Sequence, residues 1–355
     1  MASEKEYRVI GMMSGTSLDG LDIAFCHFIK VGKKWFYQIG PTETIEYSDH
    51  WKETLKTIET KDAFSFAETH INYGHFLGQQ AKSFILKHRL DVDFIASHGH
   101  TIFHQPQNKI TFQIGDGAAI AAETGKSIVC DFRSLDVALN GQGAPLVPFG
   151  DKILFNGFQC CLNLGGFANI SFEKNNERIA FDICPVNIVL NFLSETSGNS
   201  FDDRGMMAAT GKENPALLLA LNQLKYYKKK PPKSLGKEWV ISKIIPLLAT
   251  DTILISDKLR TFCEHISEQI SKILPSDSSA KVMVTGGGAH NDFLIRLLKQ
   301  KSSCEIILPD KKTIDYKEAL IFAFLGVLRV RNEINCLKSV TGASKDNISG
   351  AIYIG

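Results

Sequence analysis

The chain has 355 residues, a length that favours two domains over a single core. Its composition, 44% hydrophobic and 22% charged, is that of an ordinary globular protein, and a formal net charge of +2 gives no electrostatic basis for binding nucleic acid. The polar residues 1–6 show no secretory signal and no apolar run approaches a membrane span, so we expect a cytoplasmic protein without a membrane partner. The eight cysteines lack Cys-x-x-Cys spacing, which argues against a disulfide framework or a zinc site.

The first predicted feature is a hairpin. Runs typical of strands at 7–10 and 21–28 flank a turn, and the stretch 11–22 reads Gly-Met-Met-Ser-Gly-Thr-Ser-Leu-Asp-Gly-Leu-Asp. Glycines and hydroxyls at such a tip direct several N–H groups to one point, which suits a phosphate. Asp19 and Asp22 would repel a bare phosphate, so they indicate Mg²⁺ between the loop and a nucleotide. The alternative is a hairpin in which these residues only form the turn.

A strand over 35–47 and helices over 49–60 and 63–87 follow. The next buried strand, 93–97, is expected to end at His98-Gly99-His100-Thr101. Polar residues at the end of such a strand often build the site of an α/β sheet. A single histidine there is more often structural than catalytic, and both interpretations remain open.

The following block contains a helix over 118–124 and a strand over 128–130 that opens into Asp131-Phe132-Arg133. The guanidinium of Arg133 suits two roles: an ion pair with Asp131 or Asp136, or bidentate binding of a carboxylate.

A second hairpin with a glycine pair at its tip is predicted over 160–171. The strand 179–182 then ends on Asp182, and a helix begins near Val186. Asp182 lies too early in the chain to cap that helix, which favours a functional role for its carboxylate.

The pattern over 215–274 is helical, interrupted by the Lys/Pro-rich segment 225–233, which we interpret as an exposed loop in preference to a binding patch. A buried strand over 281–285 runs into Gly286-Gly287-Gly288. Another strand is predicted over 304–309 and a last helix over 315–330. Two acidic features have open alternatives: Asp202-Asp203 fits an ordinary turn as well as a functional motif, and Glu318 fits a first-turn acid of the last helix as well as a site residue.

In this order the motifs resemble those of the anhydro-N-acetylmuramic acid kinases, sugar kinases of the actin/hexokinase-like ATPase superfamily. The matching runs are 11–22, 97–101, 112–117, 131–148, 160–171, 179–187, 201–205, 234–239, 281–291, 317–320 and 340–355. The resemblance implies an α/β, two-domain actin-like ATPase (ribonuclease H-like) fold with an interdomain cleft. We expect a first domain over 1–135 plus 340–355 and a second over 136–339.

The resemblance also implies an ATP-dependent kinase that uses Mg²⁺ and a small-molecule sugar. The residues expected to bind the nucleotide are Gly15, Thr16, Ser17, Leu18, Asp19, Gly20, Leu21, Asp22, Asn163, Gly165, Gly166, Gly286, Gly287 and Gly288, with Asp19 and Asp22 reaching the metal through Mg-ATP. The residues expected to bind the sugar are Ser97, His98, Gly99, Thr101, Arg133, Asn187 and Glu318, with Arg133 on its lactyl carboxylate. Asp182 matches the general base, which takes a proton from the water that opens the 1,6-anhydro ring while O6 is phosphorylated.

Four positions depart from the family pattern. His100 replaces a glutamine, and Ile183, Cys184 and Val186 replace a threonine and two glycines, so the loop after Asp182 is expected to follow a different path or to reshape the pocket. Two alternatives therefore stand beside the kinase: a related sugar kinase with shifted specificity, and a nucleotide-binding actin-like scaffold without sugar chemistry. The family works in the recycling of peptidoglycan, and its members are commonly homodimers.

Overall fold

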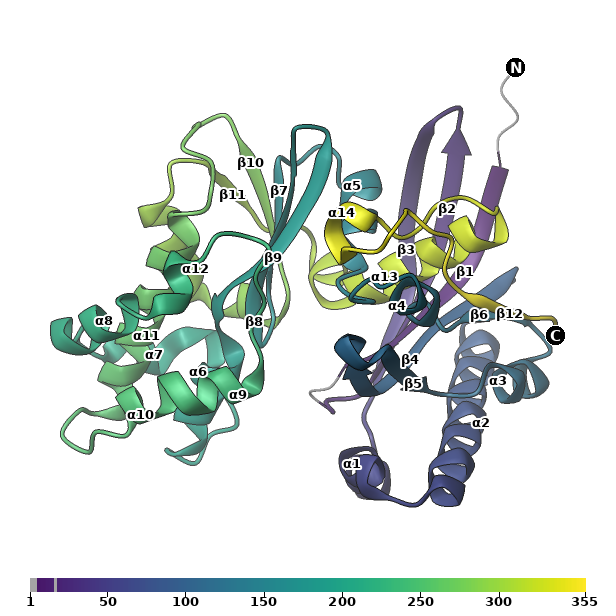
Figure 1. Ribbon diagram of the computed structural model, residues 1–355, viewed down its shortest axis with the longest axis horizontal. Helices are drawn as coiled ribbons and strands as arrows, with labels where there is room; N and C mark the ends of the chain where they lie inside the picture. Colours follow the sequence, from purple (N-terminus) through teal and green to yellow (C-terminus); the bar gives the residue numbers. More distant parts are fainter. Residues whose placement is uncertain (1–4, 16–17) are drawn as a thin grey trace. The chain divides into compact units, whose positions relative to one another are not determined.

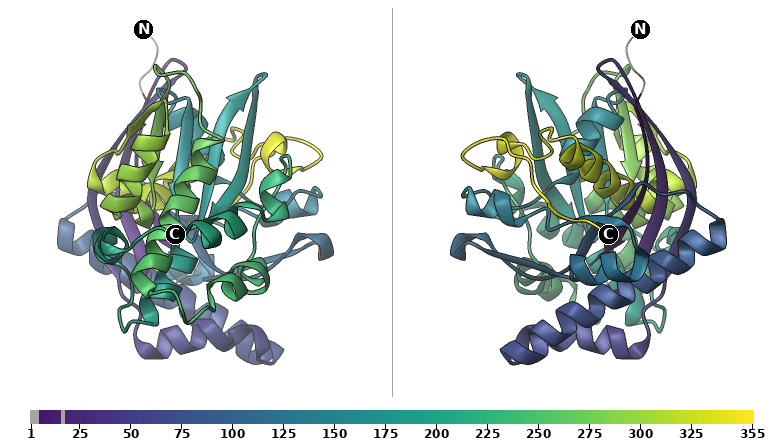
Figure 2. Two further views of the ribbon diagram at one scale, coloured as in Figure 1. Left: turned by 90° about the vertical axis from the view of Figure 1, so that its left-hand side faces the viewer. Right: turned by 90° about the vertical axis from the view of Figure 1, so that its right-hand side faces the viewer.

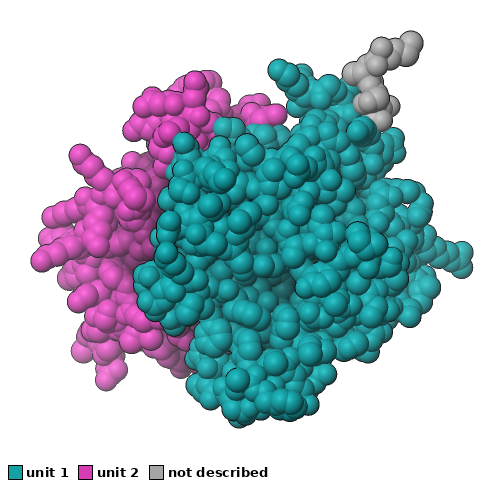
Figure 3. Space-filling model, turned by 45° about the vertical axis from the view of Figure 1, so that its right-hand side comes forward, with its two compact units in different colours: residues 1–154, 316–355 teal, residues 155–315 magenta. Residues whose placement is uncertain are grey.

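The computed structural model describes residues 5–15 and 18–355 and divides into two compact units. Unit 1 comprises Met1–Leu154 and Tyr316–Gly355, and unit 2 comprises Phe155–Asp315 (Figure 3). The observed bounds differ from the predicted ones, because residues 136–154 and 316–339 belong to unit 1. In this unit, a helix over Val147–Leu154 (α5) and the last long helix pack against each other, with Gly150 against Ile321.

Unit 1 contains a seven-stranded sheet of order β12-β6-β4-β1-β2-β3, with β5 paired to β4 (Figure 1). Its strands are β1 Lys5–Ser14, β2 Leu21–Val31, β3 Lys34–Ile45, β4 Phe94–Gln105, β5 Ile110–Ile114, β6 Ser127–Cys130 and β12 Ala351–Tyr353. Strands β1, β2 and β3 are antiparallel neighbours, whereas β4 and β6 run parallel to β1 and to each other. The carboxyl-terminal strand β12 pairs with β6, which returns the tail to this unit as predicted.

Unit 2 repeats this strand order. Its five-stranded sheet has the order β11-β10-β7-β8-β9, in which β7, β8 and β9 are antiparallel and β10 and β11 are parallel to β7. The strands are β7 Cys160–Leu164, β8 Phe167–Lys174, β9 Glu177–Pro185, β10 Lys281–Thr285 and β11 Glu305–Ile307. A hairpin meander followed by two parallel strands, present in both units, is the ribonuclease H-like sheet of the actin-like ATPases, and this confirms the predicted fold class.

The helices cover the sheets and connect their strands. In chain order the α-helices are α1 Asp49–Thr57, α2 Ala63–His88, α3 Gly117–Thr124, α4 Ser134–Ala138, α5 Val147–Leu154, α6 Asn187–Glu195, α7 Met206–Thr210, α8 Pro215–Asn222, α9 Lys237–Trp239, α10 Ile245–Leu248, α11 Ile255–Ser271, α12 Asp292–Lys301, α13 Lys311–Val330 and α14 Lys338–Thr341. Short 3₁₀ turns lie at Ile58–Thr60, Pro106–Asn108, Asp203–Gly205, Lys225–Lys228 and Gly287–His290, and a π-helical turn at Val240–Ile244. Within residues 5–15 and 18–355, no helix combines the length and the apolarity needed to cross a membrane.

The sequence explains where the first long helices begin and end. Asp62 accepts hydrogen bonds from the N–H groups of Phe64 and Ser65, which caps the start of α2, and Arg89 ends the helix in the left-handed conformation. The predicted helix 63–87 is thus confirmed, and the predicted helix 49–60 is present as α1 with a 3₁₀ turn after it.

Strand β4 is longer than predicted. The strand was expected to end at Ser97, but it continues to Gln105 because its second half pairs with β5, so residues 98–101 lie inside a strand.

Helices lie on both faces of the sheet of unit 1 (Figure 2). Ile10 and Met12 of β1 pack into one core with α2, while the intervening Gly11 faces α13. A Cβ atom at Gly11 would overlap the carbonyl oxygen of Ala319, so the helix backbone lies directly against the strand. Further along α13, Gly326 lies against Ala96 of β4 in the same way.

The contact at Gly11 gives a stability prediction. Gly11→Ala should lower the free energy of unfolding by about 3 kcal/mol, because an added methyl group forces strand and helix apart. Thermal unfolding followed by circular dichroism measures the loss. Gly157→Ala is the matched control, since a Cβ atom there meets no atom within 4 Å. Equal melting temperatures for the two variants would contradict the tight contact.

Candidate active site

The first predicted phosphate loop joins β1 to β2 in unit 1. Ser14 and Leu21 face each other across the two strands, and the N–H of Leu18 donates to the carbonyl of Gly15 over 3.2 Å. Leu18 has φ 62°, in the left-handed region. Thr16 and Ser17, both predicted to bind the nucleotide, lie outside the described residues.

The two acids of this loop differ in their surroundings. Asp19 is exposed beside a surface hollow of about 740 Å³, whereas Asp22 is half-buried on β2 and accepts a hydrogen bond of 2.7 Å from the Thr44 hydroxyl. Gly20 is buried, and the side chain of Leu21 lies in the core of unit 1, so Leu21 can meet a ligand only through its backbone. Two carboxylates near a phosphate loop fit Mg²⁺, which binds through one or two carboxylates plus phosphate oxygens. In the described part of the chain, no group of three or more His, Cys, Asp or Glu side chains is arranged to hold a metal by itself.

A buried chain of hydrogen-bonded hydroxyl groups ends at Ser14, the last residue of β1 before the first predicted phosphate loop. The Tyr47 hydroxyl donates to Ser14 over 2.6 Å and accepts from Tyr73 over 2.6 Å, and Ser14 Oγ lies 2.7 Å from Nδ1 of His100. Burial lowers the pKa of His100 to about 4, so the ring is neutral near pH 7 and its Nδ1 accepts a hydrogen bond from the Ser14 hydroxyl. His100, one of the four departures from the family pattern, thus orients the residue that precedes Gly15.

Arg133 is held by two contacts in unit 1. Its Nε donates to Nε2 of His98 over 3.0 Å, and one terminal N–H donates to the carbonyl of Gly143 over 2.6 Å. His98 is buried, and desolvation followed by the charge of Arg133 holds its pKa well below the usual range. The neutral ring therefore accepts from Arg133 at Nε2 and donates from Nδ1 to the carbonyl of Gly99 over 3.0 Å. The described polar contacts of Arg133 favour an oriented guanidinium over the alternative ion pair.

The other predicted sugar-binding residues of unit 1 lie on β4, beside His98 in the chain, and on α13. Ser97 is buried and accepts from the N–H of Gly99, and Thr101 accepts from Gln113. Glu318 lies within α13; burial raises its pKa, and the positive charges of Arg133 and Lys317 oppose that rise. Burial lowers the pKa of Arg133 to about 10, and the negative charge of Glu318 is the largest opposing influence.

Asp136 organises the loop that carries Gly143. Its fully buried carboxylate accepts hydrogen bonds of 2.8 Å from Gly143 N, 2.8 Å from Thr341 Oγ1 and 2.9 Å from Asn347 Nδ2. It thereby ties the carboxyl-terminal tail to the loop whose carbonyl orients Arg133. The sequence suggested Asp136 only as an ion-pair partner of Arg133, and no spacing signal indicated this role.

In unit 2 the structure brings together the predicted residues of the second hairpin and the glycine turn. The N–H groups of Val186 and Asn187 donate to the carbonyls of Gly166 and Gly165 over 2.8 and 3.2 Å, so the hairpin tip lies at the start of α6. The side-chain amide of Asn187 donates to the carbonyl of Leu164 over 3.2 Å.

The Gly286–Gly288 turn lies against the same hairpin. Gly286 has φ 85° and a Cβ atom there would lie 2.5 Å from the side-chain oxygen of Asn163, so only glycine fits without strain. A Cβ atom at Gly287 would lie 3.3 Å from the side-chain nitrogen of Asn187, and one at Gly288 would lie 2.8 Å from Leu164. Asn163, Gly165, Gly166, Asn187 and the three glycines therefore form one cluster.

Asp182 lies inside β9 and not at its end, which corrects the prediction. The strand continues to Pro185 because Cys184 and Pro185 still pair with β8, past a bulge between Ala168 and Asn169. Bulges often redirect a side chain next to an active site. Asp182 Oδ2 accepts a hydrogen bond of 2.9 Å from the N–H of Leu235. Burial raises the pKa of the Asp182 carboxyl, and the Leu235 hydrogen bond opposes that rise.

The three residues after Asp182 that depart from the family pattern have their side chains in the core of unit 2. Ile183, Cys184 and Val186 are buried members of the core of unit 2, and Val186 has φ −131°, outside the left-handed region that valine avoids. Asp202 serves the ordinary structural role considered for it, because its carboxylate accepts from the N–H groups of Met207 and Ala208 at the start of α7.

The Lys/Pro-rich segment is only partly the exposed loop that was predicted. Lys228, Lys229 and Lys230 are exposed, but Tyr226 is buried and its hydroxyl donates to the carbonyl oxygen of Asp182 over 2.7 Å. Sequence reasoning missed Tyr226 and Leu235 as neighbours of Asp182, although residues 234–239 had been matched to a family motif.

Two hairpins on repeated ribonuclease H-like sheets place the chain in the actin-like ATPase class. The family profile described as anhydro-N-acetylmuramic acid kinase matches residues 7–355. Proteins named anhydro-N-acetylmuramic acid kinase are similar over nearly the full length. Those from Methylobacterium nodulans and Francisella tularensis subsp. novicida are each 32% identical, covering 97% and 99% of this chain and 98% and 99% of the relative. A third, from Sulfurovum, is 32% identical and covers 98% of this chain and 99% of the relative.

The chain belongs to the anhydro-N-acetylmuramic acid kinase family. Membership in this family makes it an enzyme that binds ATP and a small-molecule sugar.

The neutral state of His100 gives a pH prediction. Its folded pKa of about 4 is below that of an unfolded histidine, so the unfolded chain binds more protons between these values and stability falls as the pH drops through this window. Between about pH 7 and pH 5 this one group should remove about 2 kcal/mol. His100→Gln, which keeps an acceptor for Ser14, should lose less stability over that range.

Thermal unfolding at several pH values measures the difference. Replacement of the exposed His50 by Gln is the control and should follow the wild-type curve. A His100→Gln curve parallel to the wild type would contradict a neutral, buried His100.

Proposed function

We propose that this chain phosphorylates 1,6-anhydro-N-acetylmuramic acid with ATP, opening the anhydro ring with water to yield N-acetylmuramic acid 6-phosphate and ADP. The observation that carries the proposal is the state of Asp182, together with the match over residues 7–355. Its carboxylate is half-buried, its pKa is raised by burial, and the Leu235 N–H holds one oxygen. A base of this kind has the proton affinity and the fixed geometry that water activation requires.

The chemistry assigns one proton transfer to this residue. Asp182 removes a proton from a water molecule as that water attacks the anomeric carbon of the sugar. The bond from the anomeric carbon to the bridging oxygen breaks, and this oxygen, O6, takes the terminal phosphoryl group of ATP. Positioning and charge neutralisation supply most of the catalysis in such a transfer.

We assign the binding roles as follows. In unit 1, residues 15–22 contact the phosphates and Asp19 and Asp22 hold Mg²⁺, which spreads the charge of the phosphates when bound. In unit 2, Asn163, Gly165, Gly166 and the Gly286–Gly288 turn contact the nucleotide.

The sugar contacts are assigned residue by residue. Arg133, held by His98 and Gly143, uses two of its five N–H groups in hydrogen bonds among the described residues, and we assign the others to the lactyl carboxylate. Ser97, His98, Gly99, Thr101, Asn187 and Glu318 are the remaining sugar-binding residues of this proposal. The product fits a role in the recycling of cell-wall fragments.

The first experiment measures ADP release with ATP and Mg²⁺, with and without the anhydro sugar, and identifies the product by mass. We expect sugar-dependent release and a product heavier by phosphate plus water. Asp182→Asn should lower kcat at least about 1,000-fold while nucleotide affinity stays near the wild type, because the amide cannot accept the proton.

The outcomes separate the alternatives. Loss of ATP affinity in Asp182→Asn would show that this carboxylate serves the metal instead. ATP turnover without any dependence on sugar would favour the scaffold, and stimulation by a different sugar would favour a kinase of shifted specificity.

A second variant tests the carboxylate contact. Arg133→Lys should raise KM for the sugar about tenfold or more and leave KM for ATP unchanged, since a lysine ammonium cannot keep both orienting contacts and still bind a carboxylate in a fork. Steady-state kinetics with each substrate varied in turn measure the two constants. Arg89→Lys, at the exposed end of α2, is the control. An unchanged KM for the sugar would remove Arg133 from the binding site.

A further inference from the structure

Asp182 contacts residues 226–235, a segment to which the proposed mechanism gives no role. Three contacts join it to residues 226–235: the Tyr226 hydroxyl donates to the carbonyl oxygen of Asp182, the N–H of Asp182 donates to the carbonyl of Lys233 over 3.3 Å, and the Leu235 N–H donates to Oδ2. Among the described residues, every hydrogen bond of the carboxylate is made through Oδ2, and Oδ1 remains available. The backbone on both sides of the side chain and one carboxylate oxygen are therefore fixed by a single segment.

Aromatic packing and the charge of Lys233 hold this segment in place. The Nζ atom of Lys233 lies 4.7 Å from the ring centroid of Tyr226 and 5.7 Å from that of Phe181, the residue before Asp182. Trp239 also packs against Tyr226, with the two ring centroids 5.3 Å apart. The neighbouring lysines at 228–230 point to solvent.

A buried polar network anchors the start of the segment to helix α11. The Tyr227 hydroxyl lies 2.8 Å from Nε2 of His265, whose Nδ1 lies 2.7 Å from the side-chain oxygen of Asn222. Burial lowers the pKa of His265 to about 3, so the ring is neutral, donates to Asn222 and accepts from Tyr227.

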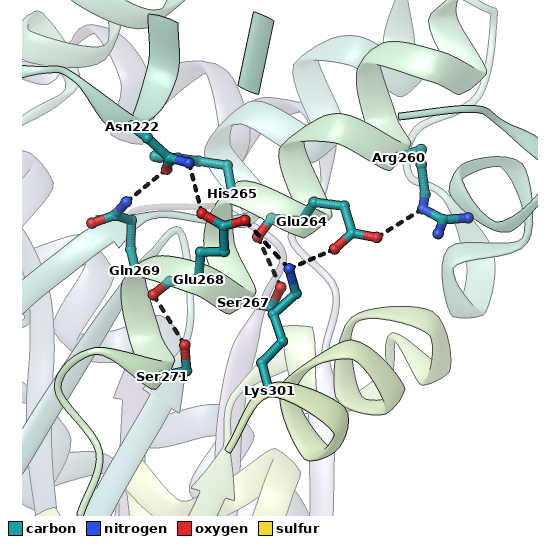
Figure 4. Close-up of polar contacts among 9 residues, drawn as sticks. All are labelled: Asn222, Arg260, Glu264, His265, Ser267, Glu268, Gln269, Ser271 and Lys301. Atoms are coloured by element: carbon teal, nitrogen blue, oxygen red, sulfur yellow. Dashed lines mark hydrogen bonds and ion pairs between the residues drawn. The ribbon is translucent and has the colours of Figure 1, made fainter. Parts of the chain in front are cut away.

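The network continues from Asn222 across α11 to α12 (Figure 4). Asn222 also binds Gln269 and Glu268, and Lys301 reaches Glu268 and Glu264 over 3.4 and 2.9 Å. Because Glu264, His265 and Gln269 are buried and paired with half-buried partners, this end of the segment has little freedom to move.

We propose that residues 226–235 form a positioning element for the general base, in which Leu235 fixes Oδ2 so that Oδ1 is the atom that receives the proton of the attacking water. Tyr226 and Lys233 fix the backbone of Asp182 in the same element. This inference rests on the proposed function, in which Asp182 is the base. Tyr226, Lys233 and Leu235 act through Asp182 and are positioning residues.

Two variants test the element. Tyr226→Phe keeps the ring and removes the hydrogen bond, and it should lower kcat about fivefold with KM for ATP unchanged, the loss expected for one such bond. Leu235→Pro removes the N–H that favours the ionised carboxylate, so the acid limb of the kcat/KM profile should move to higher pH by about one unit. Lys229→Ala, in the same segment but exposed, should match the wild type in both measurements.

Each outcome decides a different question. If Asp182→Asn is inactive while Tyr226→Phe and Leu235→Pro have wild-type kcat and pH profiles, the positioning element is wrong and the proposed function stands. If Asp182→Asn keeps its activity, Asp182 is not the general base, and both the proposed mechanism and the positioning element that rests on it are wrong. A melting curve is measured for every variant. If Leu235→Pro does not fold, kcat and KM of the folded Tyr226→Phe variant alone decide whether the positioning element is right. A loss in Lys229→Ala equal to that in Tyr226→Phe would overturn the inference in favour of a role for charge.

Discussion

The close approach of strand β1 and helix α13 is the constraint on which the candidate site of unit 1 depends. With no side chain at Gly11, the carbonyl of Ala319 lies directly against the strand, and this fixes the height of the helix above the sheet. One turn further on, the ring of Phe322 lies 4.5 Å from that of His98, and His98 in turn binds Arg133. A backbone contact that no side chain can adjust thus determines, through two packed rings, where the guanidinium lies.

In unit 2 the corresponding determinant is electrostatic. Burial raises the pKa of Asp182 and the Leu235 hydrogen bond lowers it. The position of the 226–235 segment therefore affects this pKa, because the segment carries Leu235. The neutral His265 shows the same principle, since a charged ring could not accept from Tyr227 while donating to Asn222. In both units a neutral, buried histidine belongs to the hydrogen-bonded surroundings of a charged residue that we propose as a site residue, Arg133 in unit 1 and Asp182 in unit 2.

Much of this arrangement could be predicted from the sequence, because the signals are local. The helix over 63–87, the two hairpins and the Gly286–Gly288 turn each depend on neighbours in the chain. What could not be predicted depends on pairing over long separations. Strand β4 continues past Ser97 only because β5 pairs with it, and Tyr226 and Leu235 meet Asp182 from 44 and 53 residues away. Composition correctly indicated a solvated lysine run but gave no sign of the buried tyrosine within it.

The division of the chain also has a consequence for the order in which the protein is assembled on the ribosome. Unit 2 is one continuous stretch, Phe155–Asp315, and all five strands of its sheet are synthesised in succession. Unit 1 begins first but ends last, since most of α13 and the whole of β12 come from Tyr316–Gly355. Until these residues leave the ribosome, the face of β1 at Gly11 and the edge of β6 remain uncovered. Unit 2 can therefore complete its core before unit 1 does, and the incomplete amino-terminal sheet is the species that a chaperone would meet.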